Sequence, residues 1–122
     1  MEHSTPIQPL VAVVLCTYNG EKYLRPQLDS ILAQSWQALE IIICDDGSAD
    51  NTHSILEEYR LKDPRIRYQV NQHNLGYNKN FEQAFQLAKA DYIAISDQDD
   101  IWESNKIEIM MGQWTKDSLF LF

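Results

Sequence analysis

Two apolar runs constrain the fold of this chain most. Residues 10–17 read LVAVVLCT and residues 39–44 read LEIIIC. Strands that are buried on both faces of a parallel sheet have this composition, because helices cover both of their sides. Between the two runs Leu24, Leu28 and Ile31 recur at helical spacing. The sequence therefore predicts a strand, a helix and a second, parallel strand.

The alternation of strands and helices continues to the end of the chain. We expect a helix capped by Asp50, an edge strand at 65–70, a helix with Phe81, Ala84, Phe85 and Ala88 facing inward, a buried strand at 92–96 and a helix carrying Ile107, Met110, Met111 and Trp114. The last five residues, SLFLF, predict the start of another strand. Such alternation implies right-handed crossovers and an α/β fold: a doubly wound, mostly parallel sheet with helices on both faces.

Composition restricts the class of protein and of partner. A chain of 122 residues, 44% hydrophobic and 23% charged, predicts one globular domain at 10–122 after a polar tail at 1–9. A net charge of −8 argues against a nucleic acid partner, which needs a basic face. No signal peptide is recognised, and no apolar run approaches the roughly 20 residues that cross a bilayer. We therefore expect a cytoplasmic protein, with peripheral attachment to the inner face of the membrane left open.

The cysteines and histidines do not indicate a site. Cys16 and Cys44 both lie in apolar runs, so we expect them to be buried and unpaired. The three histidines, His3, His53 and His73, are unclustered, and only His73 falls near a predicted site loop. No catalytic role is assigned to them.

Polar side chains follow three of the predicted strands. They are Thr17, Tyr18 and Asn19 after the first strand, Asp45 and Asp46 after the second, and Asp97, Asp99 and Asp100 after the strand at 92–96. In a doubly wound sheet, ligands bind beyond the carboxyl ends of the strands, at the point where the strand order reverses. A single pocket can therefore use all three loops.

The three carboxylates that follow residue 96 favour a hard divalent cation. Closely packed like charges repel one another, and Mg²⁺ or Mn²⁺ relieves that repulsion by taking one or two carboxylates while keeping water and phosphate oxygens as its other ligands. The alternative is a solvated acidic turn, which is common for an isolated Asp-x-Asp. The sharper hypothesis is a metal site for a phosphate-bearing substrate.

Four segments, in this order, resemble the N-terminal half of family 2 glycosyltransferases: VAVVLCTYNGEKYL, IIICDDGSADNT, NLGYNKNFEQA and YIAISDQDDIW. The resemblance implies the GT-A fold, with a Rossmann-like nucleotide-binding half and inverting transfer of a sugar. The last two segments are most similar to rhamnosyltransferase-like enzymes of bacterial cell-surface polysaccharide synthesis. The implied partners are a UDP- or dTDP-sugar donor and a saccharide or lipid-linked acceptor.

The resemblance also implies roles in nucleotide binding. Tyr18 corresponds to an aromatic residue that stacks on the base, and Asp46 to an acid that accepts a hydrogen bond from the pyrimidine N–H. Asp45 would brace the loop or a ribose, and Thr17 and Asn19 would support the nucleotide. Both acids could instead cap the following helix, since Asp-Asp-Gly-Ser is also an ordinary turn.

Further roles concern the diphosphate and the metal. Lys79 and Asn80 begin a predicted helix, whose N-terminus favours anions, so the diphosphate is expected near them. A solvated surface position is the alternative for Lys79. Asp97 is assigned to the nucleotide-sugar, and Asp99 and Asp100 to Mg²⁺ or Mn²⁺.

Family members continue well beyond residue 122, where the resemblance places the acceptor-binding strands and the general base. Glu108 and Asp117 belong to a predicted surface helix or its end and are not convincing bases. We therefore expect a truncated domain that binds the donor without turnover, with uncovered apolar surface near 119–122 that promotes self-association.

Two alternatives to a donor-binding half remain. One is a nucleotide-sugar-binding module, or a truncated gene product, without turnover of its own. The other is a phosphoacceptor signalling domain, which would carry paired acids after its first strand; here that strand ends in Thr-Tyr-Asn.

Overall fold

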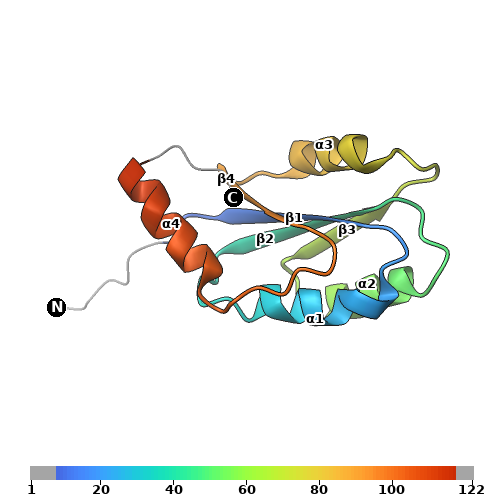
Figure 1. Ribbon diagram of the computed structural model, residues 1–122, viewed down its shortest axis with the longest axis horizontal. Coiled ribbons are helices and arrows are strands. Elements are labelled where there is room, and N and C mark those ends of the chain that lie inside the picture. The colour runs from blue at the N-terminus through green and yellow to red at the C-terminus, as the bar shows by residue number, and fades with distance from the viewer. Residues whose placement is uncertain (1–7, 118–122) are drawn as a thin grey trace.

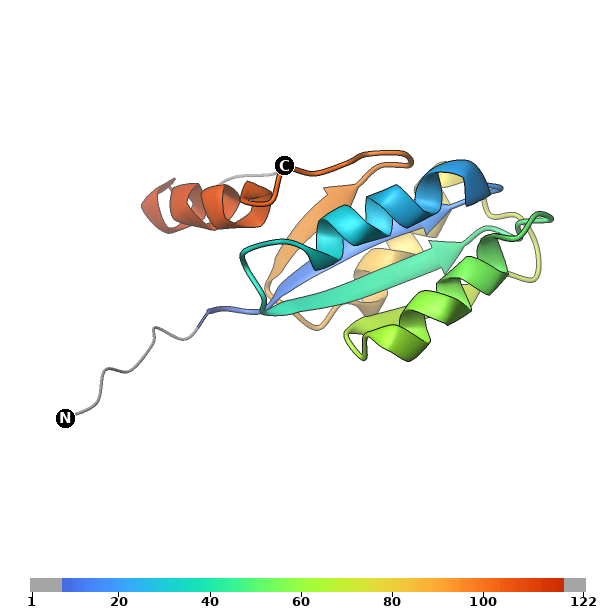
Figure 2. The same cartoon turned by 90° about the horizontal axis from the view of Figure 1, so that it is seen from below.

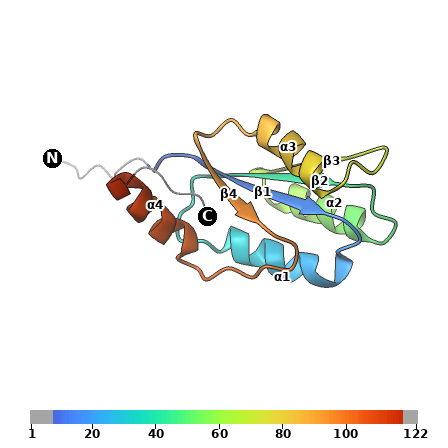
Figure 3. The same cartoon turned by 45° about the horizontal axis from the view of Figure 1, so that its top comes forward.

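The computed structural model describes residues 8–117, with side chains described as far as residue 113 (Figure 1). The elements are β1 (Val11–Thr17), α1 (Glu21–Leu32), β2 (Leu39–Asp45), α2 (Thr52–Lys62), β3 (Ile66–Val70), α3 (Tyr77–Leu87), β4 (Tyr92–Ser96) and α4 (Lys106–Asp117). All strand pairs are parallel, and the order across the sheet is β3-β2-β1-β4 (Figure 3). Within the described residues, none of the helices has both the length and the apolar character needed to span a bilayer.

Helices cover both faces of the sheet. In Figure 2, α1 and α2 lie in front of the strands and α3 lies behind them. Alternate residues of β1 point to opposite faces. Val13 and Leu15 join the larger core cluster with residues of α1, α2 and α4, whereas Val14 packs with Phe81 and Ala84 of α3. The prediction of a doubly wound α/β sheet is confirmed.

The strand order reverses beside β1. The chain moves outward from β1 through β2 to β3, and then crosses by α3 to β4 on the other side of β1. Right-handed crossovers in opposite directions place their helices on opposite faces, which explains why, among the described helices, α3 packs on the face opposite α1 and α2. The carboxyl ends of β1, β2 and β4 therefore meet at the reversal point.

Several local predictions need correction. Asn51, and not Asp50, is the N-cap of α2, although Asp50 Oδ1 accepts the Thr52 N–H at 3.0 Å. Phe85 is 38% exposed and does not point into the core, because α3 buries a narrower stripe than its sequence pattern predicts. The predicted final strand and the Trp114 side chain lie outside the described part of the structure.

Cys16 and Cys44 lie opposite each other in the β1–β2 register, and both are free thiols, as predicted. Cys44 is buried, whereas Cys16 is only partly buried. Burial raises the pKa of Cys16 to about 12. The Cys16 thiol is therefore protonated at neutral pH and a poor nucleophile.

The burial pattern predicts which leucines stabilise the fold. Leu28 is fully buried in the larger cluster, and Leu61 on α2 is 71% exposed. We expect Leu28→Ala to lower the free energy of unfolding by about 2–5 kcal/mol, because it removes apolar contacts and leaves a cavity. The matched Leu61→Ala change should cost less than about 0.5 kcal/mol. Urea unfolding of both variants checks this, and equal costs would contradict the assigned core.

Candidate functional site

Three loops meet at the carboxyl edge of the sheet around a hollow of about 340 Å³. This sheet-edge hollow is lined by Cys16, Thr17, Tyr18, Asp46, Gly76, Tyr77, Asn80, Phe81 and Gln98. A larger hollow of about 560 Å³ lies beside the edge strand β3, but none of the predicted site residues lines it. The structure therefore brings residues from all three predicted strand ends together at one place.

Two exposed aromatic rings line the sheet-edge hollow. Tyr18 follows β1 and is 49% exposed, and Tyr77 begins α3 and is 65% exposed. The Tyr77 hydroxyl donates to Asp97 Oδ1 at 2.9 Å, and this hydrogen bond raises the pKa of Tyr77. Its ring lies 4.9 Å from that of Phe81, centroid to centroid. Both tyrosines offer an aromatic face for a planar ligand.

Tyr77 was not selected from the sequence. The preceding Gly76 has a φ of 86°, a left-handed conformation that a side chain would strain, and this turn sets the direction in which α3 begins. The sequence feature that could have indicated Tyr77 as a site residue is a glycine followed by an aromatic residue at the start of a predicted helix. Only the folded arrangement shows that this helix start faces the end of β1.

Asp46 binds the loop between β3 and α3. Its Oδ1 accepts hydrogen bonds from the Asn71 side chain at 3.0 Å and the Leu75 N–H at 2.7 Å, and its Oδ2 accepts the Gly76 N–H at 3.1 Å. Burial alone would raise its pKa, but these bonds, led by that from Leu75, hold the pKa of Asp46 below its ordinary value. Since a carboxylate oxygen has two lone pairs, Oδ2 can accept one more N–H.

Asp45 is fully buried, and both of its carboxylate oxygens accept hydrogen bonds from other groups of the protein. Oδ1 accepts the hydroxyls of Thr17 at 2.5 Å and Ser48 at 2.6 Å. Oδ2 accepts the N–H groups of Gly47 at 3.1 Å and Ser48 at 2.8 Å, and lies 2.8 Å from His53 Nε2. These contacts brace the loop after β2, which is one of the two roles expected for Asp45.

The position of His53 corrects the sequence interpretation. The sequence predicts that only His73 lies close to a site loop, yet His53 contacts Asp45 directly. The residues are eight positions apart, and the turn into α2 brings the first helical turn back over the end of β2. No sequence periodicity predicts a contact of this kind.

The loops after β1 and β2 satisfy each other's backbone groups. The Asn19 N–H donates to Ser48 Oγ at 2.7 Å, and Asn19 Oδ1 accepts the Ala49 N–H at 2.7 Å. At the start of α1, the Gly20 N–H donates to Thr52 Oγ1 at 3.1 Å. Thr52, the first residue of α2, thus accepts an N–H at the start of α1, whose own N-cap residue, Gly20, makes no side-chain cap.

The acidic loop after β4 forms a tight turn. The Asp100 N–H donates to the Asp97 carbonyl at 3.0 Å, and the Asp97 N–H donates to Asp100 Oδ2 at 3.1 Å. Asp99 is exposed, with a φ of 63°. The Gln27 side chain anchors the turn by donating to the Asp97 carbonyl at 2.7 Å.

The acidic loop offers oxygen ligands of the kind that a divalent cation takes. Within residues 8–117, no group of three or more His, Cys, Asp or Glu side chains is placed to hold a metal. Mg²⁺ and Mn²⁺ often bind through only one or two carboxylates, with water and phosphate oxygens completing their coordination. The turn carries three carboxylates, and its Asp97 is bonded to Tyr77 of the sheet-edge hollow. The turn therefore offers carboxylate oxygens, the type of ligand that these cations take, beside the sheet-edge hollow.

The two predicted residues of α3 have different surroundings. Asn80 is 2% exposed and lines the sheet-edge hollow, while its amide donates to the Cys44 carbonyl at 2.9 Å. Lys79 lines a separate hollow with Glu82, Gln83 and Gln86. The structure therefore brings Asn80, but not Lys79, to the other candidate residues.

This chain is similar to known proteins over most of its length. Residues 12–120 match the family model described as glycosyl transferase family 2. Chondroitin synthase of Escherichia coli is 37% identical over 109 residues, which are 89% of this chain and 16% of that protein. The dTDP-rhamnosyl transferase RfbG of Shigella flexneri is 43% identical over 100 residues, which are 77% of this chain and 34% of that protein.

A solved structure shares the fold. The structure of S. aureus TarS 1-349 in complex with UDP-GlcNAc has a TM-score of 0.82 and 26% sequence identity, over 89% of this chain and 32% of that one. Our chain thus spans about a third or less of the length of these three proteins.

The Asp46 contacts predict a pH-dependent stability. The folded pKa lies below the ordinary 3.8, so the ionised carboxylate stabilises the fold. This contribution is complete above about pH 5 and is lost as the pH falls through the folded pKa. We expect Asp46→Asn to unfold at lower urea concentration than the wild type at pH 7, with the difference shrinking toward about pH 2. A difference that does not change with pH would contradict the role of the charge.

Proposed function

Because this chain belongs to glycosyl transferase family 2, we propose that residues 10–122 form the GT-A donor-binding domain of an enzyme that transfers a sugar from a nucleoside diphosphate to an acceptor. The observation that carries the proposal is the sheet-edge hollow, where two exposed tyrosines, an ionised aspartate and an acidic turn adjoin. An inverting reaction in bacterial polysaccharide synthesis, in the cytoplasm or at the inner face of the membrane, completes the proposal.

The hollow supports recognition of a nucleoside. Tyr18 and Tyr77 offer aromatic faces on which a base can stack. Such stacking stabilises the bound nucleoside and does not depend on hydrogen bonds to the base. The remaining acceptor site on Asp46 Oδ2 suits a base that carries an imide N–H, such as uracil or thymine. TarS, whose fold is shared, is described in complex with UDP-GlcNAc. We therefore propose a UDP- or dTDP-sugar as the donor.

The acidic turn supports a divalent cation beside the nucleoside. Asp99 and Asp100 would hold Mg²⁺ or Mn²⁺, which when bound neutralises the charge that develops on the diphosphate. Asp97 would stay with the nucleotide-sugar, because the Tyr77 hydroxyl already orients its Oδ1. Asn80 lies at the start of α3, on the side of the helix that faces the hollow.

The proposal assigns no general base among the described residues. Glu108, a downstream acid, accepts a hydrogen bond from Ser35 Oγ at 2.6 Å. Ser35 follows α1 near the amino end of β2, away from the carboxyl edge of the sheet. Glu108 is therefore not proposed as the general base, and a binding module without turnover is the second candidate.

The metal assignment can be tested by calorimetry. We expect UDP or dTDP to bind the chain only with Mn²⁺ present, and Asp99→Asn with Asp100→Asn to abolish this binding. The control is Asp91→Asn, an exposed aspartate at the opposite end of β4, which should bind as the wild type does. Metal-independent binding, or full binding by the double variant, would contradict the assignment. Absence of binding by the folded wild type would contradict donor binding by this domain.

Tyr77 gives a second test of the same hollow. We expect Tyr77→Ala to weaken UDP binding about tenfold, since base–aromatic stacking is worth about 1–3 kcal/mol. Tyr77→Phe retains the ring and should bind within about threefold of the wild type, because it loses only the hydrogen bond to Asp97. Equal losses in both variants would instead assign the effect to the hydroxyl.

A further inference from the structure

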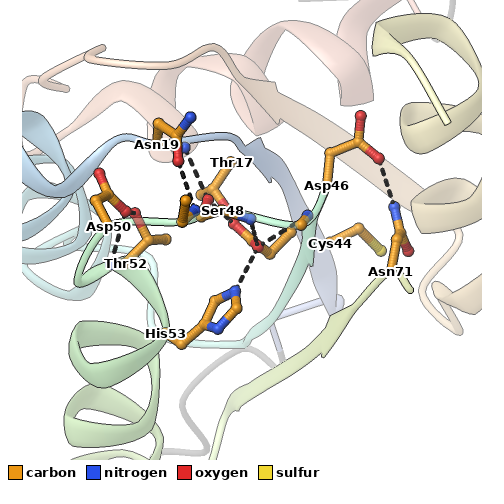
Figure 4. Close-up of polar contacts among 12 residues, drawn as sticks. Thr17, Asn19, Cys44, Asp46, Ser48, Asp50, Thr52, His53 and Asn71 are labelled. Carbon is orange, nitrogen blue, oxygen red and sulfur yellow. Dashed lines mark hydrogen bonds and ion pairs between the residues drawn. The ribbon is translucent and has the colours of Figure 1, made fainter. Parts of the chain in front are cut away.

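Both chain neighbours of Tyr18 are tied to one buried carboxylate. Thr17, immediately before it, donates its hydroxyl to Asp45 Oδ1 at 2.5 Å. Asn19, immediately after it, donates its N–H to Ser48 Oγ at 2.7 Å, and the Ser48 hydroxyl donates to the same Asp45 oxygen at 2.6 Å (Figure 4). The backbone that presents Tyr18 is therefore held on both sides through Asp45.

The other oxygen of Asp45 connects this arrangement to α2. Besides two backbone N–H groups of its own turn, Oδ2 is 2.8 Å from Nε2 of His53. An ionised carboxylate accepts hydrogen bonds only, so His53 Nε2 is the donor. Burial alone would raise the pKa of Asp45, but hydrogen bonds led by those from Ser48 hold it below its ordinary value, which keeps the group ionised.

The His53 side chain is 43% exposed, whereas that of Asp45 is fully buried. Among the described residues, three side chains donate hydrogen bonds to Asp45. His53 belongs to α2, whereas Thr17 ends β1 and Ser48 belongs to the turn after β2. His53 is not among the residues that line the sheet-edge hollow. Any effect of His53 on a ligand there must pass through the loop that it anchors.

We propose that His53 is a positioning residue for Tyr18: its hydrogen bond to Asp45 sets the place of the carboxylate to which both neighbours of Tyr18 are tied. The inference rests on the proposed function, in which Tyr18 stacks on the base of the donor. It assigns to His53 an influence on the nucleoside part of the ligand and none on the diphosphate.

A matched pair of variants separates the hydrogen bond from packing. Gln and Met have similar size and shape, but only Gln can donate an N–H to Asp45. UDP and pyrophosphate, each with Mn²⁺, are titrated into the full chain. We expect His53→Met to weaken UDP binding about fivefold, a free energy of about 1 kcal/mol, and to leave pyrophosphate binding within about twofold. His53→Gln should restore UDP binding to within about twofold of the wild type.

A double-mutant cycle tests the route through Tyr18. Tyr18→Ala should weaken UDP binding about tenfold, and adding His53→Met to it should change the affinity by less than about twofold, because the ring that His53 positions is already gone. Independent, multiplying losses in the double variant would overturn the proposal. Equal losses of UDP and pyrophosphate binding in His53→Met would also overturn it, since they indicate a general structural role.

Controls keep the failure of each hypothesis distinct. His73→Met changes another exposed histidine and should leave both ligands unaffected. If the wild type binds no UDP, the proposed function fails; if Tyr18→Ala binds UDP normally, the stacking role fails; if only His53→Met is without effect, this inference fails alone. Should His53→Met not fold, His53→Phe keeps a flat ring without an N–H donor to Asp45, and the same UDP-selective loss is required of it.

Discussion

Burial of β1 on both faces is the constraint on which the rest of the structure depends. Its residues from Val11 to Leu15 are at most 1% exposed, with α1 and α2 on one side of the sheet and α3 on the other. Because both faces of this strand are covered, none of these side chains can contact a ligand. Polar groups are concentrated where it ends, and the parallel arrangement places the ends of β2 and β4 beside it.

Polar groups at that edge satisfy one another before any ligand binds. Asp45 holds the loop after β1, Asp46 holds the loop before α3, and Gln27 holds the acidic turn. Unpaired polar groups in such surroundings would destabilise the fold, so the network both closes the core and orders the loops. The exposed groups left over, chiefly two tyrosine rings and the carboxylates of the turn, are those available to a ligand.

Most of the elements could be predicted from sequence, because the periodicity of buried side chains reports directly on strands and helices. The positions at which polar residues follow strands also predicted a candidate site at the carboxyl edge of the sheet, where the sheet-edge hollow lies. The structure adds contacts of single side chains that the sequence does not predict. Thr17 and Asn19 bond to other loops, Lys79 points to a different hollow, and Tyr77 and His53 were not selected.

Sequence alone determined the strand and helix alternation, the parallel sheet and the family resemblance, since these depend on local patterns of residue type. Tertiary structure decided which polar groups form hydrogen bonds within the protein and which are exposed to a ligand. That distinction depends on contacts between loops far apart in the chain, such as Asp46 with Leu75 and Asp97 with Tyr77. The distances between such groups follow from how the strands are ordered in the sheet, and no local pattern encodes them.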